Sequence, residues 1–532
     1  MPLVPPPSKR LVKFPFPLQG LNSTVPSLVL SKGYCPRSDM IRFGRGEVSS
    51  QAVLAQRAPF GVLTFISGAF TQQRVDGTFV VYAATTDTFK TYDFTSDTWF
   101  TVPGTVAAVG HYEDFWSFAD VFGEVFASNG AGSLMWTADG ASIIDLNALP
   151  NPLGYSGRYL VPFAGRLVLA NTREGAVQHE DRVRWSVAQS PRDFTSDSSA
   201  GANDLVDLPG PITGMSTLGG RNFIHKRSGI TAMIETGLRT PSFSFQTVVD
   251  GIGAIAGRTL LNIRGVQFFL GADDVYVYDG ASAPRPIGEA IRREVFDHLN
   301  WAKVGTSFAL DYADFHEYHL FVPLNNDEMP RQIYIYNYLD NTWTKRTIPD
   351  HTVSGFQASH ANSGAYLPVA PATDIWDGVD NTWDTGSDNT SDVWDQPSER
   401  THLVPFFAQT LGAILYPDEA ATTLDQAVLL ETADWDLDLP GMLKTVDRIR
   451  LIVRQRNDAT LSLSISTNGG ATFTTPVTAA PGAPVGDETS LKTLFAPVTR
   501  TTGEFFRLRL TASQRFSLVS WELEVIDRAE VR

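Results

Sequence analysis

Short runs of apolar residues, bounded by turn residues, recur along the chain from about residue 60 to residue 350. Runs of this length between Gly, Pro, Asn and Asp residues are typical of β-strands joined by tight turns. One unit has β-prone runs at 80–84, 88–94 and 98–102, which are separated by Thr86-Asp87 and Ser96-Asp97. Asp, Ser and Thr side chains form local hydrogen bonds in turns. This stretch therefore predicts a three-stranded antiparallel meander.

An aromatic strand followed by an acidic turn recurs at 134–142, 275–282 and 333–343. Repeated meanders of this kind favour a β-propeller, in which each blade buries its faces against its neighbours. The fold class is therefore predicted as all-β, with an irregular β-propeller over residues 56–370. A string of β-sandwiches is the alternative. One helix is expected at 287–298, packed on a blade edge, because Ile287, Ile291, Val295 and Phe296 share one helical face.

From about residue 440 to the end, apolar and polar residues alternate with the period of a half-buried strand. The apolar positions are Ile449, Leu451, Val453, Leu461, Leu463, Ile465, Trp521, Leu523 and Val525. The polar positions are Arg448, Arg450, Arg454, Ser462, Ser464, Ser520, Glu522 and Glu524. With the segment 505–510, this pattern predicts a separate C-terminal β-sandwich over 441–532 that folds on its own, with Trp521 buried.

The composition of the chain changes between residues 371 and 400, where seven aspartates are interspersed with Trp376, Trp383 and Trp394. Residues 371–440 are predicted as a Trp/Asp-rich surface excursion or docking segment. The tryptophans are then packing anchors or contacts to a neighbouring subunit. The aspartates lack the fixed ligand spacing of a calcium loop, so no metal site is predicted there.

The composition limits the classes of function. With 43% hydrophobic and 19% charged residues the chain can close sizeable cores, which excludes global disorder. A net charge of −16 disfavours binding to nucleic acids, because Lys and Arg supply most of that affinity. An acidic wall past which DNA slides is compatible with the same charge.

The start of the chain and its single cysteine bear on the compartment. Cys35 is the only cysteine, which excludes an intramolecular disulfide and a multi-cysteine zinc site. The opening MPLVPPPSKR has three consecutive prolines, Pro5 to Pro7, where a signal peptide needs an apolar helix. No run of about 18 apolar residues follows, so membrane insertion is not expected. The protein is therefore expected to be made and assembled in the cytosol.

Catalytic motifs are absent from the sequence: it has no phosphate-binding loop, no HExxH and no GxSxG. His111, His225 and His298 are interpreted as surface or turn residues. The acidic pairs Asp273-Asp274 and Glu113-Asp114 are expected on turns. The chain is therefore predicted not to be an enzyme, with no catalytic, cofactor-binding or metal-ligating residues and no cofactor.

The segment 466–473, STNGGATF, resembles the Asp-box hairpin of sialidase propellers, with Asn468 in place of Asp. Asn-Gly between strands is in itself a strong hairpin signal. The segment is therefore predicted to be a structural turn.

Several segments resemble tail nozzle proteins of short-tailed bacteriophages, the family of tail tubular protein B. They are KFPFPLQGLN (13–22), SDMIRFGRGEV (38–48), RWSVAQSPRDF (184–194), VYVYDGASAPRPIGEAIRREVF (275–296), the NTW turn (341–343) and the Trp/Asp-rich segment. The resemblance implies a propeller-bearing structural virion protein located in the tail and assembled in the host cytoplasm.

Such a protein forms a homo-hexameric ring below the portal and the head–tail adaptor. The ring extends the DNA channel, retains packaged DNA, conducts double-stranded DNA during ejection without specific binding, and docks tail fibres or spikes. Residues 1–55 are then an N-terminal arm whose strands join the propeller or the adaptor.

Acidic loops are expected to face the bore of such a ring, and the arginines at 448, 450, 454, 507 and 509 to lie on outer or intersubunit faces. The alternative function is a sialidase-like or carbohydrate-binding β-propeller that acts on host glycans. The arginine cluster that would hold a sialic acid carboxylate is not identifiable from the sequence. Subunit number and activity on sugars distinguish the two functions.

Overall fold

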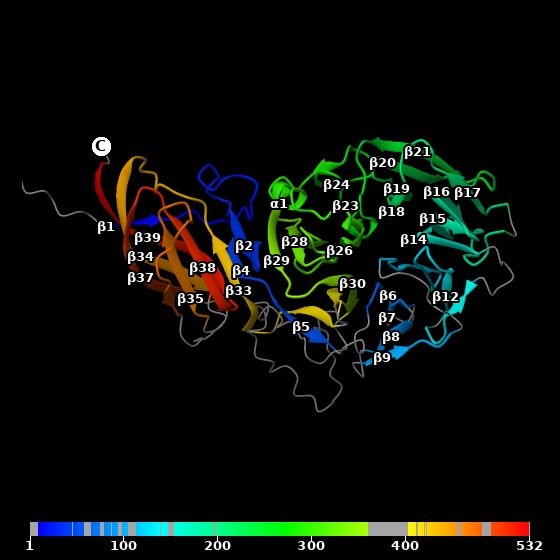
Figure 1. Ribbon diagram of the computed structural model, residues 1–532, viewed down its shortest axis with the longest axis horizontal. Helices are drawn as coiled ribbons and strands as arrows, with labels where there is room; N and C mark the ends of the chain where they lie inside the picture. Colours follow the sequence, from blue (N-terminus) through cyan, green and yellow to red (C-terminus); the bar gives the residue numbers. More distant parts are fainter. Residues whose placement is uncertain are drawn as a thin grey trace, which may run out of the picture.

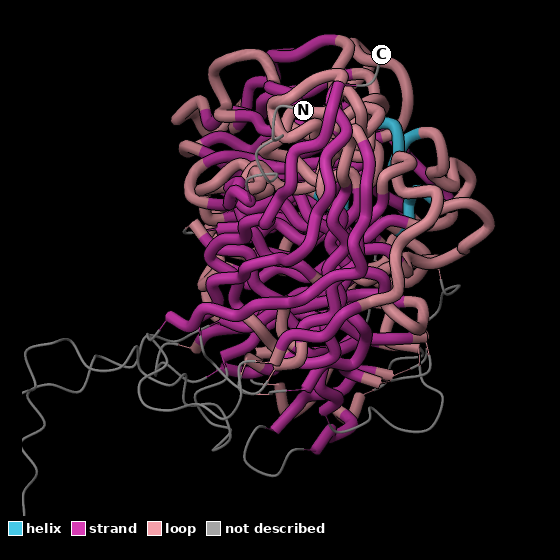
Figure 2. The backbone as a smooth tube through the Cα atoms, turned by 90° about the vertical axis from the view of Figure 1, so that its left-hand side faces the viewer, coloured by secondary structure: helices cyan, strands magenta, loops and turns pink. Residues whose placement is uncertain are grey.

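The structure is a computed structural model that describes most of the chain, and the described part consists of strands and loops with very little helix (Figure 2). The described residues are 9–44, 46–57, 65–74, 79–86, 88–93, 98–104, 113–138, 140–146, 154–195, 198–359, 403–410, 413–419, 421, 423–454, 459–480 and 491–530. The Trp/Asp-rich segment at 371–400 and His111 lie outside them.

Seven four-stranded antiparallel sheets form the blades of a propeller in the part of the chain that the structure describes. In blade order their strands are β6–β9 (Gly68–Gln73, Phe79–Ala84, Phe89–Asp93, Thr98–Thr101), β10–β13 (Ser117–Val121, Glu124–Ser128, Met135–Thr137, Ile144–Asp145), β14–β17 (Tyr155–Phe163, Arg166–Glu174, Val177–Trp185, Gly201–Asp204), β18–β21 (Ile212–Leu218, Arg221–Lys226, Gly229–Glu235, Phe243–Asp250), β22–β25 (Leu261–Ile263, Val266–Leu270, Val275–Tyr278, Arg285–Pro286), β26–β29 (Phe308–Tyr312, Glu317–Val322, Gln332–Asn337, Thr342–Thr347) and β30–β32 with β5 (Thr352–Ser359, Leu403–Gln409, Ile414–Asp418, Val53–Arg57).

The first strands of successive blades contact one another around a closed ring, from β6 through β10, β14, β18, β22 and β26 to β30 and back to β6 (Figure 1). The seventh blade is completed by β5, which precedes the first blade in the chain and pairs antiparallel with β32. Pairing of strands from the two ends of the propeller within one sheet closes the ring. The predicted propeller and its first meander are confirmed.

A β-sandwich of two antiparallel sheets lies beside the propeller (Figure 1). One sheet contains β1 (Lys9–Lys13), β3 (Ile41–Gly44), β4 (Glu47–Ser50), β34 (Met442–Arg454), β37 (Leu491–Gly503) and β39 (Ser517–Glu530). The other contains β2 (Arg37–Asp39), β33 (Thr423–Glu431), β35 (Leu461–Ser466), β36 (Val477–Ala479) and β38 (Arg507–Gln514). The apolar face expected from the alternation is buried, with Trp521 and Leu523 both 0% exposed.

The two ends of the chain thus build the sandwich together, and the propeller is inserted between them. The chain enters the propeller at β5 and leaves it at β32, where Val53 pairs with Asp418. The expected boundaries therefore need correction. Strands β1–β4 pair within the sandwich rather than with the propeller, and the described part of 371–440 supplies β31 and β32 to the seventh blade and β33 to the sandwich. Sheet partners that come from opposite ends of a sequence leave no local pattern that reveals the pairing.

The helix expected at 287–298 is shorter, because α1 spans only Arg292–Phe296. The preceding residues are held by the neighbouring strand of the fifth blade, since Ile287 N donates to Val275 O at 2.8 Å and Gly288 N donates to Asp274 Oδ1 at 2.7 Å. The expected face is nevertheless buried, with Ile291 and Val295 at 0% exposure. Short 3-10 turns occur at η2 (Gly257–Thr259) and η3 (Val304–Thr306).

One apolar cluster runs without interruption from the sandwich into blades five and six. It joins Phe43 and Trp521 of the sandwich to Phe268 of β23, Tyr318 of β27 and Trp343 of β29. The other blades pack against each other through smaller clusters. Because no solvated layer separates the two parts, they are expected to behave as one body. None of the described helices is long and apolar enough to cross a membrane.

Candidate functional site

Four of the segments that carry the family resemblance meet where the propeller joins the sandwich. We call this region the junction: residues 13–22, 38–48, 275–296 and 341–347, the last of which extends the NTW turn (341–343) to the end of β29. Leu21 N donates to Trp343 O at 2.7 Å, and the Trp343 indole Nε1 donates to Ile287 O at 2.7 Å. Met40 N donates to Lys345 O at 3.1 Å. The first and third of these hydrogen bonds join segments more than 200 residues apart in the sequence.

Gly20 illustrates how closely the chains approach one another in the junction. Its φ is +84°, and a Cβ at this position would lie 2.8 Å from Trp343 O. Both the left-handed backbone and the absence of a side chain are therefore required here. Glycine in KFPFPLQGLN thus lets the N-terminal segment lie directly on the edge of the sixth blade.

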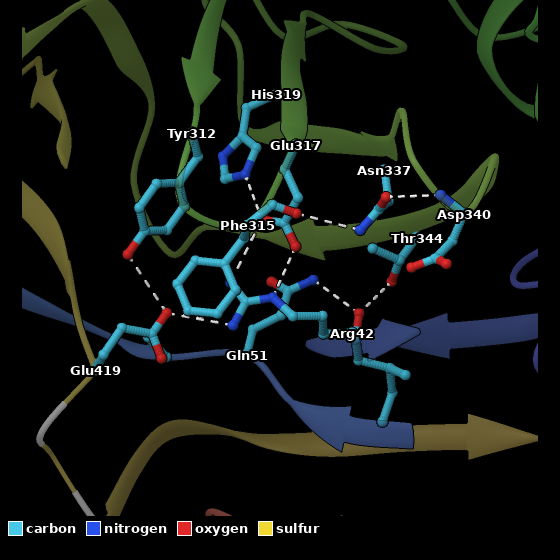
Figure 3. Close-up of polar contacts among 12 residues, drawn as sticks. Arg42, Gln51, Tyr312, Phe315, Glu317, His319, Asn337, Asp340, Thr344 and Glu419 are labelled. Atoms are coloured by element: carbon cyan, nitrogen blue, oxygen red, sulfur yellow. Dashed lines mark hydrogen bonds and ion pairs between the residues drawn. The ribbon is translucent and has the colours of Figure 1, made fainter. Parts of the chain in front are cut away.

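Arg42 of β3 extends from the sandwich into the propeller (Figure 3). Its Nε donates to Glu317 Oε1 at 2.7 Å and its Nη1 donates to Glu419 Oε1 at 3.2 Å. The guanidinium also stacks 3.6 Å from the Phe315 ring centre. Glu317 has a second partner in His319 Nε2 at 2.9 Å. The carboxylates of Glu317 and Glu419 are 2% and 9% exposed, so this network is sealed from solvent.

The electrostatics of this network favour its charged form. Burial disfavours the ionised carboxylate of Glu317, but Arg42 and His319 outweigh it and lower the pKa of Glu317 to about 2. Burial likewise opposes the charge on Arg42, but the two carboxylates raise its pKa above the usual arginine value. Removing one partner of a charge pair that is buried this well typically lowers the stability of the protein by several kcal/mol. The network therefore acts as a clamp between the two parts.

A second buried arginine, Arg346 of β29, joins the same two parts. Its Nη2 binds both carboxylate oxygens of Asp425 in β33, at 2.8 and 3.0 Å, and its Nη1 donates to Ala52 O at 2.6 Å. Next to it, Thr347 Oγ1 donates to Asp39 Oδ2 at 3.1 Å. The outer strand of the sixth blade is thus bound to the sandwich through side chains on alternate faces.

A pocket of about 200 Å³ lies on the propeller axis, near the starts of the inner strands. Its lining comes from blades two to six: Phe115, Trp116, Ser117, Arg158, Tyr159, Leu160, Met215, Ile255, Ala256, Gly257, Arg258 and Gly305. Two arginines and one phenol are the polar groups most suited to bind a ligand there. None of the described residues that line the pocket is Asp or Glu, whereas glycoside hydrolysis requires a pair of carboxylates.

The arginines predicted on outer or intersubunit faces have partners within the chain. Arg450 lies 2.8 Å from Glu522, Arg507 lies 2.7 Å from Asp434, and Arg509 lies 2.7 Å from Glu431. Arg454 pairs with Glu47, and Arg448 lies 3.9 Å from Glu524. Their charges therefore bind the sandwich together.

The interpretation of the histidines is partly wrong. His225 is 0% exposed within β19, where its Nε2 lies 3.1 Å from Gln267 Oε1 of the next blade. A polar partner across the blade interface makes this burial possible. His298 is on the surface, as expected, with Nδ1 3.0 Å from Glu294 O.

The acidic pairs also have structural roles. Asp274 is fully buried, and its carboxylate accepts hydrogen bonds from Arg292 and from the amides of Val275 and Gly288. Glu113 pairs with Lys303. Cys35 is buried, its thiol donates to Gly20 O, and burial raises its pKa to about 12.

The Asp-box-like segment forms a tight turn in the sandwich, between β35 and β36. Asn468 Oδ1 accepts from Thr472 N at 3.0 Å, and Gly469 and Gly470 have φ values of +69° and +85°. The prediction of a structural turn agrees with this geometry. Within the described residues, no group of three or more His, Cys, Asp or Glu side chains is arranged to hold a metal ion.

Sequence reasoning missed the residues that carry the junction and the axis pocket, namely Arg42, Glu317, Glu419 and Arg258. Arg42 alternates with buried Ile41 and Phe43, a pattern that indicates a solvated position, but the propeller covers it. Arg258 follows the glycine-rich segment GIGAIAG, and no periodicity distinguishes it.

Comparison with known proteins shows similarity in fold alone. Neither a protein-family model nor a curated protein matches the chain. Among solved structures it is similar to YCF48 bound to a D1 peptide, at 10% identity and a TM-score of 0.40, over 69% of this chain and 99% of that one.

The chain is also similar to BBS1N in complex with ARL6, at 12% identity and a TM-score of 0.38, over 70% of this chain and 99% of that one. A third similar structure is AztD of Citrobacter koseri, at 12% identity and a TM-score of 0.31, over 59% of this chain and 81% of that one. YCF48 and BBS1 are β-propeller proteins. The chain is itself a β-propeller joined to a β-sandwich, as its own sheets establish.

Proposed function

We propose that this protein is a structural subunit of a tail nozzle, the ring that extends the DNA channel of a short-tailed bacteriophage below the portal and the adaptor. In this role six copies surround the channel, retain packaged DNA, conduct it during ejection and dock tail fibres or spikes. The location is the tail of the virion.

The observation that carries the proposal is the junction. Turn-rich β sequences resemble one another by chance, but chance resemblances have no reason to gather at one point in space. Three of the segments that resemble nozzle proteins contact one another through Leu21, Ile287 and Trp343, and Met40 of a fourth bonds Lys345, two residues after the NTW turn. Among the described segments, 184–194 is the exception, because it lies in and after β16 of the third blade.

The joint between propeller and sandwich suits a wall that must hold back packaged DNA. The buried pairs of Arg42 and Arg346 and the continuous apolar cluster resist hinge motion between the two parts. A subunit in a ring transmits force through such a joint without opening. This mechanical requirement supports a structural role.

The path of DNA in this proposal lies between subunits. The propeller axis holds a pocket of only about 200 Å³, bordered by Phe115, Trp116 and Arg258. A duplex whose major groove alone is about 12 Å wide cannot pass there. The bore must therefore be the lumen of a ring of several copies.

The charge of the chain agrees with a bore that does not bind DNA. The net charge is −16, and the arginines at 448, 450, 454, 507 and 509 are neutralised by carboxylates of the same chain. Free Lys and Arg contacts to phosphate would act as friction at every step of ejection.

The proposal is tested by native mass spectrometry of the purified chain, alone and mixed with its head–tail adaptor. The expected result is one to a few copies alone and a complex with six copies on the adaptor ring. A chain that stays monomeric with the adaptor and binds or cleaves glycans would favour the alternative, a carbohydrate-binding propeller.

A further inference from the structure

Arg258 lies on the propeller axis and makes contacts across it. It comes from η2, before the first strand of the fifth blade, and its Nη2 donates to Val353 O of the seventh blade at 2.6 Å. Its guanidinium lies 3.7 Å from the Phe115 ring centre and 5.0 Å from that of Phe308. Its Nη1 is buried and has no hydrogen-bond partner among the described residues.

The lack of a counter-ion sets Arg258 apart from the other buried arginines. Arg42, Arg346, Arg507 and Arg515 each lie within hydrogen-bond distance of a buried or half-buried carboxylate. For Arg258, no described Asp or Glu forms an ion pair. Arg258 is half-buried as a residue, but its Nη1 is inaccessible to solvent, and a guanidinium desolvated in this way without an anion is costly, because two aromatic rings replace only part of its hydration. Burial lowers the pKa of Arg258 to about 9.

The groups around Arg258 complete a site for an anion. Arg158 of β14 also lines the pocket, where its like charge further disfavours the cation at Arg258, and Tyr159 adds a phenol. The rest of the wall combines the apolar side chains of Leu160, Met215 and Ile255 with Ser117. The volume of about 200 Å³ is below the ~300–1,000 Å³ of pockets for drug-sized ligands.

We propose that this pocket binds a small carboxylic acid. The carboxylate would accept hydrogen bonds from the guanidinium of Arg258 and from Arg158, and the compact apolar body of the acid would lie on Leu160 and Met215. A planar guanidinium matches the two oxygens of a carboxylate. An inorganic oxyanion has no apolar surface that could pack against Leu160 and Met215. The site lies within one chain, so it does not depend on the proposed ring.

Benzoate, its neutral isostere benzamide and inorganic phosphate are suitable probes for titration calorimetry on the full chain. Benzoate is expected to bind, raise the midpoint of thermal unfolding and change the fluorescence of the protein through Trp116, while benzamide and phosphate bind at least tenfold more weakly. Arg158→Gln changes an exposed side chain and is expected to weaken benzoate binding about tenfold. Arg293→Gln, on the exposed surface of α1, is the matched control and should leave it unchanged.

Arg258→Lys retains the charge but loses the planar donor pair, so it is expected to weaken benzoate binding by more than tenfold in a folded protein. Equal binding of benzoate and benzamide, tighter binding of phosphate than of benzoate, or unchanged affinity in Arg158→Gln would each overturn the proposal. Failure of benzoate to bind at millimolar concentration would overturn it as well.

Discussion

Replacement of Arg42 by methionine tests whether the junction clamps the two parts together. Methionine retains much of the side-chain length but removes all donors. Glu317 would lose two hydrogen bonds, at 2.7 and 3.3 Å, and Glu419 one at 3.2 Å. Both carboxylates are nearly inaccessible to water, so solvent cannot replace the lost partner.

The expected loss of stability depends on the hydrogen-bond partners that each carboxylate keeps in the variant. Removing one partner of a buried charge pair typically costs about 3–5 kcal/mol. Glu317 retains His319, and Glu419 retains Arg515 at 2.6 Å, so we expect the lower end, about 3 kcal/mol. The exposed pair of Arg293 with Asp297 is the control, and Arg293→Gln should cost less than about 0.5 kcal/mol.

Chemical denaturation of the full chain, followed by tryptophan fluorescence and by circular dichroism, measures this effect. The wild type should unfold with coincident transitions by both probes, and Arg42→Met should unfold at lower denaturant with transitions that separate. Adding Glu317→Gln to Arg42→Met should recover part of the loss, because the uncompensated charge is then removed. A loss below about 1 kcal/mol, with no recovery in the double variant, would refute the clamp.

Four further predictions follow. Glu317 has a folded pKa of about 2 against an ordinary 4.5, so its contribution to stability is complete above pH 4.5 and is lost as the pH falls towards 2; the stability difference between wild type and Glu317→Gln should shrink in that window, and a constant difference from pH 7 to pH 2 would contradict the assignment. Trp521→Ala should destabilise the sandwich by about 3–5 kcal/mol, because the ring is fully buried against Phe14 and Phe16; an unchanged denaturation midpoint would mean that this core is misassigned. The fragment 440–532 should remain unfolded, contrary to the expectation from its sequence, since it lacks β33, the neighbour of β38, and β1, the neighbour of β39; dispersed amide resonances would show that it needs neither. Binding of the full chain to double-stranded DNA should be negligible at low ionic strength, where attraction is least screened; a tight complex that weakens steeply with salt would reveal a basic DNA-binding surface.

The sequence predicted those features of the fold that local periodicity encodes. Alternation at Ile449, Leu451 and Val453 identified the buried face of β34, and acidic turns marked the ends of blade strands. Both signals arise within a few residues, because a strand exposes alternate side chains to core and solvent.

Long-range pairing was not predictable in the same way. Backbone hydrogen bonds between strands do not depend on which side chains the strands carry, so nothing in the sequence of β5 indicates that it pairs with β32. For the same reason, the sequence did not reveal that the N-terminal strands, expected on the propeller or the adaptor, pair within the sandwich. Polar residues were misread wherever a second part of the chain covers them. Arg42 and His225 both occupy positions that look solvated along their own strands, and only the packed neighbour reveals Glu317 or Gln267.

Electron cryomicroscopy of the chain assembled on its adaptor, with DNA present, tests the proposed function most directly. The proposed role predicts six copies around a common lumen, with duplex density in that lumen and the propeller axes closed at Arg258. A ring with DNA density along the propeller axes, or the absence of any ring, would contradict it.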